Sequence, residues 1–87
     1  MLNKTLIIQN KLGLHARAAN KFVKTVEAYN CKVTVSLNNM TSDGKSLMGL
    51  MSLGAMKGSE IHLFVEGDKA VLEALTSLIN KKFEESE

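Results

Sequence analysis

A histidine and an arginine lie two residues apart in the segment Gly13-Leu14-His15-Ala16-Arg17, at the predicted start of a helix. The first turn of a helix exposes about four unpaired backbone amides and a partial positive charge, which favour an anion such as phosphate. The same positive end disfavours an imidazolium ion, so we expect the His15 ring to be neutral and nucleophilic. The guanidinium of Arg17 and the backbone amides of Ala16 and Arg17 can then hold phosphoryl oxygens. These residues predict reversible phosphorylation of a ring nitrogen of His15.

A lone histidine at a helix start also suits a plain capping or packing role, so this motif alone does not decide between structure and chemistry. The other histidine, His62, falls on the solvent side of a predicted strand, where we expect a solvated or packing role. No cluster of metal-ligand residues and no pair of carboxylates accompanies His15, so we expect neither a metal nor a cofactor. The single cysteine, Cys31, is expected to be a small buried or half-buried apolar residue.

Short periodic segments predict the elements that must position this motif. Alternating and β-branched residues predict strands at 5–9, 32–37, 40–42 and 61–66. Apolar residues at three- and four-residue steps predict helices at 16–29, 47–53 and 69–83. Ser46 is the expected N-cap of the second helix and Asp68 that of the third, and the tail 84–87 is expected to fray.

The order βαββαβα predicts an α+β fold in which one four-stranded antiparallel sheet carries three helices on one face. The chain has 87 residues, of which 45% are hydrophobic and 23% charged, so we expect one domain over 1–87. The other face of the sheet should be mostly polar, as Thr34, Ser36 and His62 indicate. Phe64 falls on the same face and does not fit this pattern.

The charge of the chain is mild but unevenly distributed. A formal charge of +2 gives no indication of nucleic-acid binding. Seven of the 11 cations lie in the first 45 residues with only two acids, which suits acidic protein partners and equally suits a plain solubility pattern. We find neither a signal peptide nor a membrane-spanning stretch, so we expect a cytoplasmic monomer without stable membrane association.

The predicted short helix after Ser46 has too many apolar residues to bury. A core-facing stripe covers little more than 100° of a helix, so one or two of its side chains must face solvent, Met48 first and then Met51. Beside His15, these would form an adaptable apolar patch for several partners, ringed by positive charge. The residues expected to dock partners are Asn20, Lys21, Lys24, Leu47, Met48 and Met51.

Two segments carry a resemblance to a known family. The segment 10–19, which is Asn-Lys-Leu-Gly-Leu-His-Ala-Arg-Ala-Ala, resembles the active-site signature of the HPr family, the small histidine phosphocarriers of the bacterial phosphotransferase system. The segment 44–54 resembles the second motif of that family, around its regulatory serine. The separation of the two motifs also fits, and the similarity runs through essentially the whole chain.

This resemblance implies roles for three residues. His15 matches the histidine that receives phosphate from phosphorylated enzyme I and passes it to an EIIA domain, and Arg17 matches the arginine that steadies the phosphoryl group. Ser46 matches the serine that HPr kinase/phosphorylase modifies in many bacteria to damp the transfer. The resemblance also implies that the protein is a stoichiometric carrier of phosphate and not a turnover enzyme, and that its fold is an open-faced β-sandwich.

One departure from the family pattern leaves the branch open. Ala18 stands where the family usually has proline, and alanine keeps the helix, so we expect no loss of activity. The segments 10–13 and 83–85 resemble the nitrogen-related branch, NPr, which controls metabolism through phosphorylation-dependent binding, whereas the second motif resembles the sugar branch.

Ser46 is open to two interpretations that are compatible with each other. It suits a plain N-cap, which contributes about 1 kcal/mol to the helix. A phosphate there would add about −1.5 to −2 charges where the helix dipole tolerates them, and would repel an acidic partner.

Overall fold

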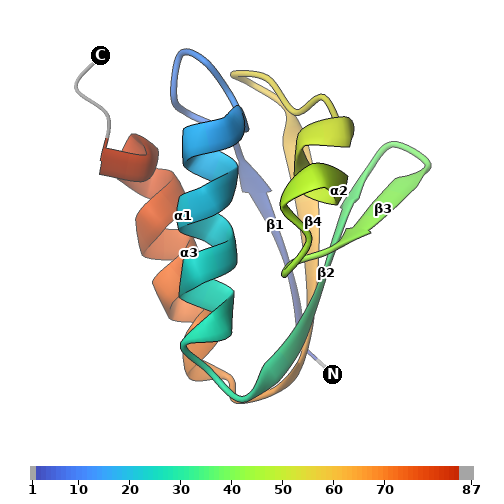
Figure 1. Cartoon of the computed structure of the whole chain (residues 1–87), viewed down its shortest axis with the longest axis vertical. Coiled ribbons are helices and arrows are strands. Elements are labelled where there is room, and N and C mark those ends of the chain that lie inside the picture. The colour runs from blue at the N-terminus through green and yellow to red at the C-terminus, as the bar shows by residue number, and fades with distance from the viewer. Residues whose placement is uncertain (1, 85–87) are drawn as a thin grey trace.

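The computed structural model describes residues 2–84, and its elements follow the predicted order (Figure 1). Within this range the strands are β1 (Leu2–Ile7), β2 (Cys31–Leu37), β3 (Met40–Asp43) and β4 (Glu60–Gly67). The helices are α1 (Ala16–Glu27), α2 (Leu47–Ser52) and α3 (Ala70–Asn80), and a short turn, η1 (Lys82–Glu84), follows α3. None of these helices is long and apolar enough to cross a membrane.

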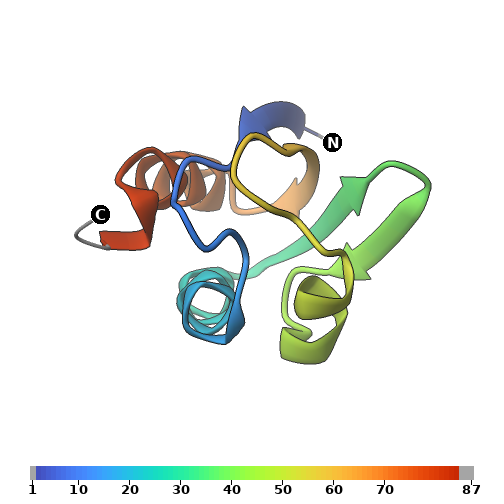
Figure 2. The ribbon, with the colours of Figure 1, turned by 90° about the horizontal axis from the view of Figure 1, so that it is seen from above.

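The four strands of residues 2–84 form one antiparallel sheet in the order β1-β4-β2-β3. The register brings apolar side chains to the same face, since Leu63 of β4 lies opposite Val35 of β2 and Ile61 lies opposite Leu6 of β1. Seen from above, all three helices lie on that face (Figure 2). This arrangement confirms the predicted α+β fold, an open-faced β-sandwich.

The core lies between the sheet and the helices, where the predicted apolar stripes meet. Helix α1 buries Phe22 and Val26, and α3 buries Leu75 and Ile79. Ala18, at the position where the family usually has proline, is completely buried in this core. Complete burial of a side chain as large as Phe or Leu stabilises a fold by about 1.5–3 kcal/mol, so these stripes hold the helices against the sheet.

The outer face of the sheet is open and largely polar, as predicted. His62 lies on this face and shares a hydrogen bond of 2.8 Å between its Nδ1 and Oγ1 of Thr5, which confirms a packing role for this histidine. Phe64 lies on the same face, paired across the sheet with Asn3 and Thr34, and remains about 37% exposed.

The first strand lies further toward the N-terminus than predicted. Strand β1 pairs with β4 from Leu2 to Ile7, because this register places Leu2 and Leu6 on the core side. Ile8 and Gln9, which we expected in the strand, follow it, and the amide of Ile8 donates to the carbonyl of Ser59.

The ends of the helices also differ from the sequence prediction. Helix α1 ends at Glu27 instead of 29, and α2 ends at Ser52, with Leu53 as its C-cap. The N-cap of α3 is Lys69 and not the predicted Asp68, although Asp68 accepts a hydrogen bond from the amide of Ala70. Helix α3 stops at Asn80 instead of 83. The sequence predicts fraying over 84–87, but Glu84 belongs to the η1 turn, and 85–87 lie outside the described residues.

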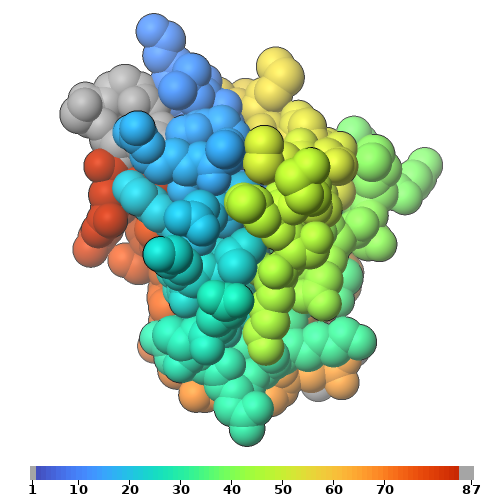
Figure 3. Space-filling view, in the orientation of Figure 1, coloured from blue at the N-terminus to red at the C-terminus, as the bar shows by residue number. Residues whose placement is uncertain are grey.

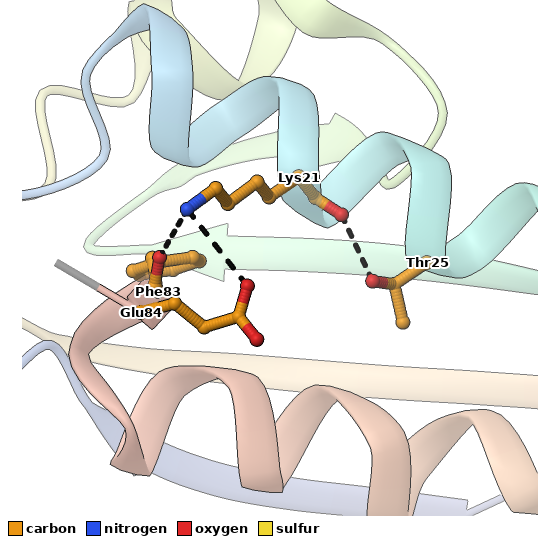
Figure 4. A network of polar contacts seen from close by, with 4 residues as sticks. All are labelled: Lys21, Thr25, Phe83 and Glu84. Atoms are coloured by element: carbon orange, nitrogen blue, oxygen red, sulfur yellow. Dashed lines mark hydrogen bonds and ion pairs between the residues drawn. The ribbon is translucent and has the colours of Figure 1, made fainter.

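Helix α3 ends early because the chain turns back toward α1. Lys82, Phe83 and Glu84 have φ angles of +56°, +55° and +63°, a left-handed conformation that costs roughly 1–2 kcal/mol per residue. The turn buries the Phe83 ring completely. Nζ of Lys21 on α1 donates to the carbonyl of Phe83 at 2.6 Å and lies 3.9 Å from Oε1 of Glu84 (Figure 4). The buried ring and this hydrogen bond together offset the strain of the turn.

Replacing Phe83 tests this account of the C-terminal turn. We expect Phe83→Ala to lower the free energy of unfolding by about 3–5 kcal/mol, because it empties a fully buried aromatic site and leaves the strained turn without its anchor. Urea denaturation measures this change, and Phe64→Ala on the open face serves as the matched control, with a smaller loss expected. Equal losses for the two variants would show that η1 is not anchored by its aromatic side chain.

Candidate functional site

His15 is the N-cap of α1 and its ring is half-exposed at the end of the helix. Its backbone is extended, with φ −78° and ψ −178°, and its carbonyl accepts from the amide of Ala19. Ring nitrogen Nδ1 accepts a hydrogen bond of 3.3 Å from the backbone amide of Arg17. This contact places the lone pair of a neutral ring on Nδ1 and its hydrogen on Nε2. The position that the sequence predicted for this ring, at a helix N-terminus and open to water, is confirmed.

The charges at the start of α1 favour an anion. The first turn of α1 contains no acidic residue that could neutralise the partial positive charge of the helix end. It contains Arg17, whose side chain is exposed, and the exposed Ala16 precedes it. A phosphoryl group at this end of α1 would therefore meet backbone N–H groups and, within reach, a guanidinium.

The start of α1 is held by a contact between two loops at the same end of the molecule (Figures 1 and 2). The amide of Leu14 donates to the carbonyl of Ala55 at 2.9 Å, and Nδ2 of the buried Asn10 donates to the carbonyl of Gly13 at 2.7 Å. Gly13 has φ +69°, and a Cβ built on it would lie 2.4 Å from the carbonyl oxygen of Ala55. Glycine is required here because the two backbones touch.

Ser46 is the N-cap of α2, as the sequence predicts. Its Oγ accepts a hydrogen bond of 3.0 Å from the amide of Gly49, and its own amide donates to the carbonyl of Asp43. The side chain is half-exposed, so its hydroxyl serves the helix and is still open to a modifying enzyme.

Helix α2 lies beside the start of α1 on one face of the molecule (Figure 3). It buries Leu50, and Leu53 is buried directly after it, while Leu47, Met48 and Met51 are exposed. The sequence predicted one or two exposed apolar residues, so this count was too low. The physical reason is length, because a helix of six residues packs only one narrow stripe against its neighbours.

The residues of α1 that the sequence assigned to partner docking separate into two groups. Asn20 and Lys24 are exposed along the helix. Lys21 is half-buried, and its ammonium is bonded to the C-terminal turn (Figure 4). The Lys21 ammonium, expected among the positive charges around the apolar patch, therefore makes a contact within the fold.

Sequence reasoning missed two exposed apolar residues at this end of the molecule. Leu12 lies directly before Gly13, and Met56 lies in the loop that Gly13 touches. A large apolar residue between turn glycines, as in Gly54-Ala55-Met56-Lys57-Gly58, is a signal that could have identified Met56.

The metal-ligating residue types between residues 2 and 84 form no metal site. Among residues 2–84 no group of three or more histidine, cysteine and acidic side chains could hold a metal ion. Cys31 is half-buried as predicted, its Sγ donates to the carbonyl of Val26 at 3.8 Å, and burial raises the pKa of its thiol.

Comparison with known proteins identifies the family. The sequence model described as "PTS HPr component phosphorylation site" matches residues 2–81 of the chain. The chain belongs to the HPr family. It is 49% identical to the phosphocarrier protein HPr of Neisseria meningitidis serogroup A over the full length of both, and 49% identical to HPr of Pseudomonas aeruginosa over 94% of each chain.

Solved HPr structures share the whole fold. An HPr structure from Thermoanaerobacter tengcongensis superposes with a TM-score of 0.94 at 40% identity and covers all of both chains. An HPr structure from Bacillus anthracis gives 0.85 at 32% identity, over 90% of this chain and 95% of that one. Membership in a family of phosphocarriers thus agrees with the position of His15 at the open end of α1.

The contact that positions His15 can be tested with two glycines of the same conformation. Gly13 and Gly54 both have φ +69°, but a Cβ on Gly54 would meet nothing within 4 Å. We expect Gly54→Ala to cost about 1 kcal/mol of unfolding free energy, for backbone strain alone. We expect Gly13→Ala to cost a further 1–3 kcal/mol, roughly, because the methyl group collides with backbone. Urea denaturation of both variants measures the difference. Equal losses of unfolding free energy would show that the close approach of the two backbones adds no cost at Gly13.

Proposed function

We propose that this HPr protein carries a phosphoryl group on His15, accepting it from phosphorylated enzyme I and passing it to EIIA domains of the phosphoenolpyruvate-dependent sugar phosphotransferase system. The observation that carries the proposal is the lone pair of His15 Nδ1, held at the open N-terminus of α1 beside the amide of Arg17. The HPr name of its relatives supports the sugar branch over the nitrogen-related one.

The transfer step needs only groups of the two proteins. The Nδ1 lone pair of His15 attacks phosphorus on the donor, and the bond from phosphorus to the donor nitrogen breaks as the new P–N bond forms. The Arg17 amide, now 3.3 Å from Nδ1, is then positioned to donate to a phosphoryl oxygen, with the amide of Ala16 next to it. The Arg17 guanidinium supplies further donors as charge builds up on these oxygens.

The exposure of the site supports a carrier instead of a turnover enzyme. A half-exposed ring at the end of a helix can enter the active site of a partner, which then excludes water from the phosphoryl group. The same ring must leave with the phosphate and enter a second partner. We therefore infer a stoichiometric carrier that works between cytoplasmic proteins.

The proposed docking surface combines α1 and α2. Its exposed residues are Asn20 and Lys24 on α1 with Leu47, Met48 and Met51 on α2 (Figure 3). Basic and apolar side chains together suit acidic partners with an apolar contact region. Lys21, which the sequence assigned to this surface, is left out because its ammonium is bonded to the carbonyl of Phe83.

Ser46 is the proposed regulatory site, and HPr kinase/phosphorylase is the enzyme that would act on it. Its Oγ lies at the N-cap of α2, where the backbone tolerates a phosphate dianion. Leu47 and Met48 follow it directly, so the new charge would lie at the docking surface and repel an acidic partner. This modification would change docking without unfolding the protein.

Removing the acceptor tests the central claim. Incubation with phosphoenolpyruvate and enzyme I should give one acid-labile phosphate per chain, and His15→Ala should abolish it because the nucleophile is lost. His62→Ala, which removes the histidine of the open sheet face, should be labelled like the unaltered protein. Undiminished labelling of the His15 variant would defeat the proposal.

Arg17 has a role that kinetics can separate from docking. We expect Arg17→Ala to lower the maximal transfer rate about 10–100-fold with the fold intact, because a charged donor to the transferring group is lost. Lys24→Ala should instead raise the KM of this protein as a substrate of phosphorylated enzyme I and leave the maximal rate unchanged, since this residue is placed only at the docking surface. An Arg17 variant that changes KM alone would assign the arginine to docking.

A further inference from the structure

The methionines of the described chain all lie on the surface. Their exposed fractions are 71% for Met48, 68% for Met56, 51% for Met40 and 38% for Met51. The core between residues 2 and 84 is built without methionine, from Val, Leu, Ile, Phe and Ala. Methionine is a soft residue that elsewhere fills gaps in cores or forms adaptable contact surfaces, so its distribution here favours the second use.

Three of these methionines lie at the end of the molecule that carries His15. Met48 and Met51 belong to α2, which lies beside the start of α1 (Figure 3). Met56 belongs to the loop that holds His15 in place, because a Cβ on Gly13 would lie 2.8 Å from its Cα. Met40 differs, since it begins β3 at the turn of the β2–β3 hairpin, and the tip of this hairpin lies away from α1 (Figure 2).

We propose that Met48 and Met56 form a reversible oxidation site, at which peroxide converts thioethers to sulfoxides and so weakens docking of the phosphoryl-transfer partners. The proposal rests on the proposed carrier function for its effect on docking. Helix α2 contacts α1, and the loop of Met56 contacts Gly13, so both lie next to the segment that carries His15. A partner that encloses His15 would therefore cover both. A sulfoxide at either place would bring a strongly polar group under the partner, where its hydrogen bonds to water are lost.

The chemistry needs no group beyond the peroxide. The sulfur lone pair attacks one oxygen of hydrogen peroxide, the O–O bond breaks, and the second oxygen leaves as water with both protons. Sulfur loses two electrons and the peroxide gains them. Methionine sulfoxide reductases reverse the change with a dithiol, which becomes a disulfide as the oxygen leaves as water.

The single cysteine is partly shielded from the oxidant. The thiolate is the reactive form of cysteine, and Cys31 is half-buried with its Sγ donating to the carbonyl of Val26. Burial raises the pKa of this thiol, so the thiolate is scarce at neutral pH. The exposed thioethers carry no such restriction, because their reactivity does not depend on losing a proton.

Limiting peroxide followed by peptide mass spectrometry tests the site without reference to any partner. We expect Met48 and Met56 to be oxidised before Met51, in line with their exposure, and Cys31 to be oxidised last. Earlier oxidation of Met51 or of Cys31 would overturn the assignment of the site.

Transfer from phosphorylated enzyme I tests the effect on docking. Oxidation should raise the KM of the protein about ten-fold, with circular dichroism showing an intact fold, and methionine sulfoxide reductases should restore it. The double variant Met48→Leu with Met56→Leu should show no rise in its KM after limiting peroxide, which spares the less exposed Met51, because leucine has a similar volume and no sulfur. The KM of Met40→Leu, the matched control, should rise after peroxide as it does in the unaltered protein.

Three results would count against the docking effect. The docking effect is overturned if the KM of the unaltered protein does not change after oxidation. It is also overturned if Met40→Leu prevents the rise in KM, or if the KM of the double variant rises after limiting peroxide. If the reduced protein takes no phosphate from enzyme I, the carrier function itself fails and the docking effect fails with it, whereas the order of oxidation still stands or falls by mass spectrometry alone.

Discussion

The close contact between Gly13 and the backbone of Ala55 is the constraint on which the site depends. Leu14 then donates to the same carbonyl, and the chain enters α1 at His15 in a direction that this pair of contacts sets. A helix end that binds an anion must be open to water, and open ends of helices fray. The loop contact resolves this conflict because it fixes the backbone before the helix and leaves the ring half-exposed.

The same end of α1 concentrates the features that phosphoryl transfer requires. The amide of Arg17 reaches Nδ1, no acidic residue weakens the field of the first turn, and the guanidinium of Arg17 is exposed. The short helix α2 leaves its apolar side chains beside this end because it is too short to bury them. The ring of His15 and the proposed docking surface thus arise from one arrangement of two helices.

The η1 turn after α3 contacts α1 and stabilises this arrangement. The η1 turn is strained, yet it places Phe83 in the core and its carbonyl against Lys21 of α1. A lysine that looks like one of several surface cations in the sequence therefore belongs to the fold. Charge patterns in a sequence reveal where cations lie along a helix, but they do not reveal which of them a distant segment binds, since that contact spans 62 positions.

The sequence by itself determined the order of elements, the caps at His15 and Ser46, and the face that each strand buries, because these depend on local geometry and on periods of two and 3.6 residues. The motif residues indicated an anion at the start of α1, but they did not by themselves decide between a capping role and chemistry. Only the tertiary structure decided which loop positions His15, how many side chains of α2 stay exposed, and where α3 ends. The position of His15 and the end of α3 depend on contacts between segments far apart in the chain, such as Gly13 with Ala55, and such contacts leave no periodic trace in the sequence. The exposure of α2 follows from its length of six residues, which the packed structure sets.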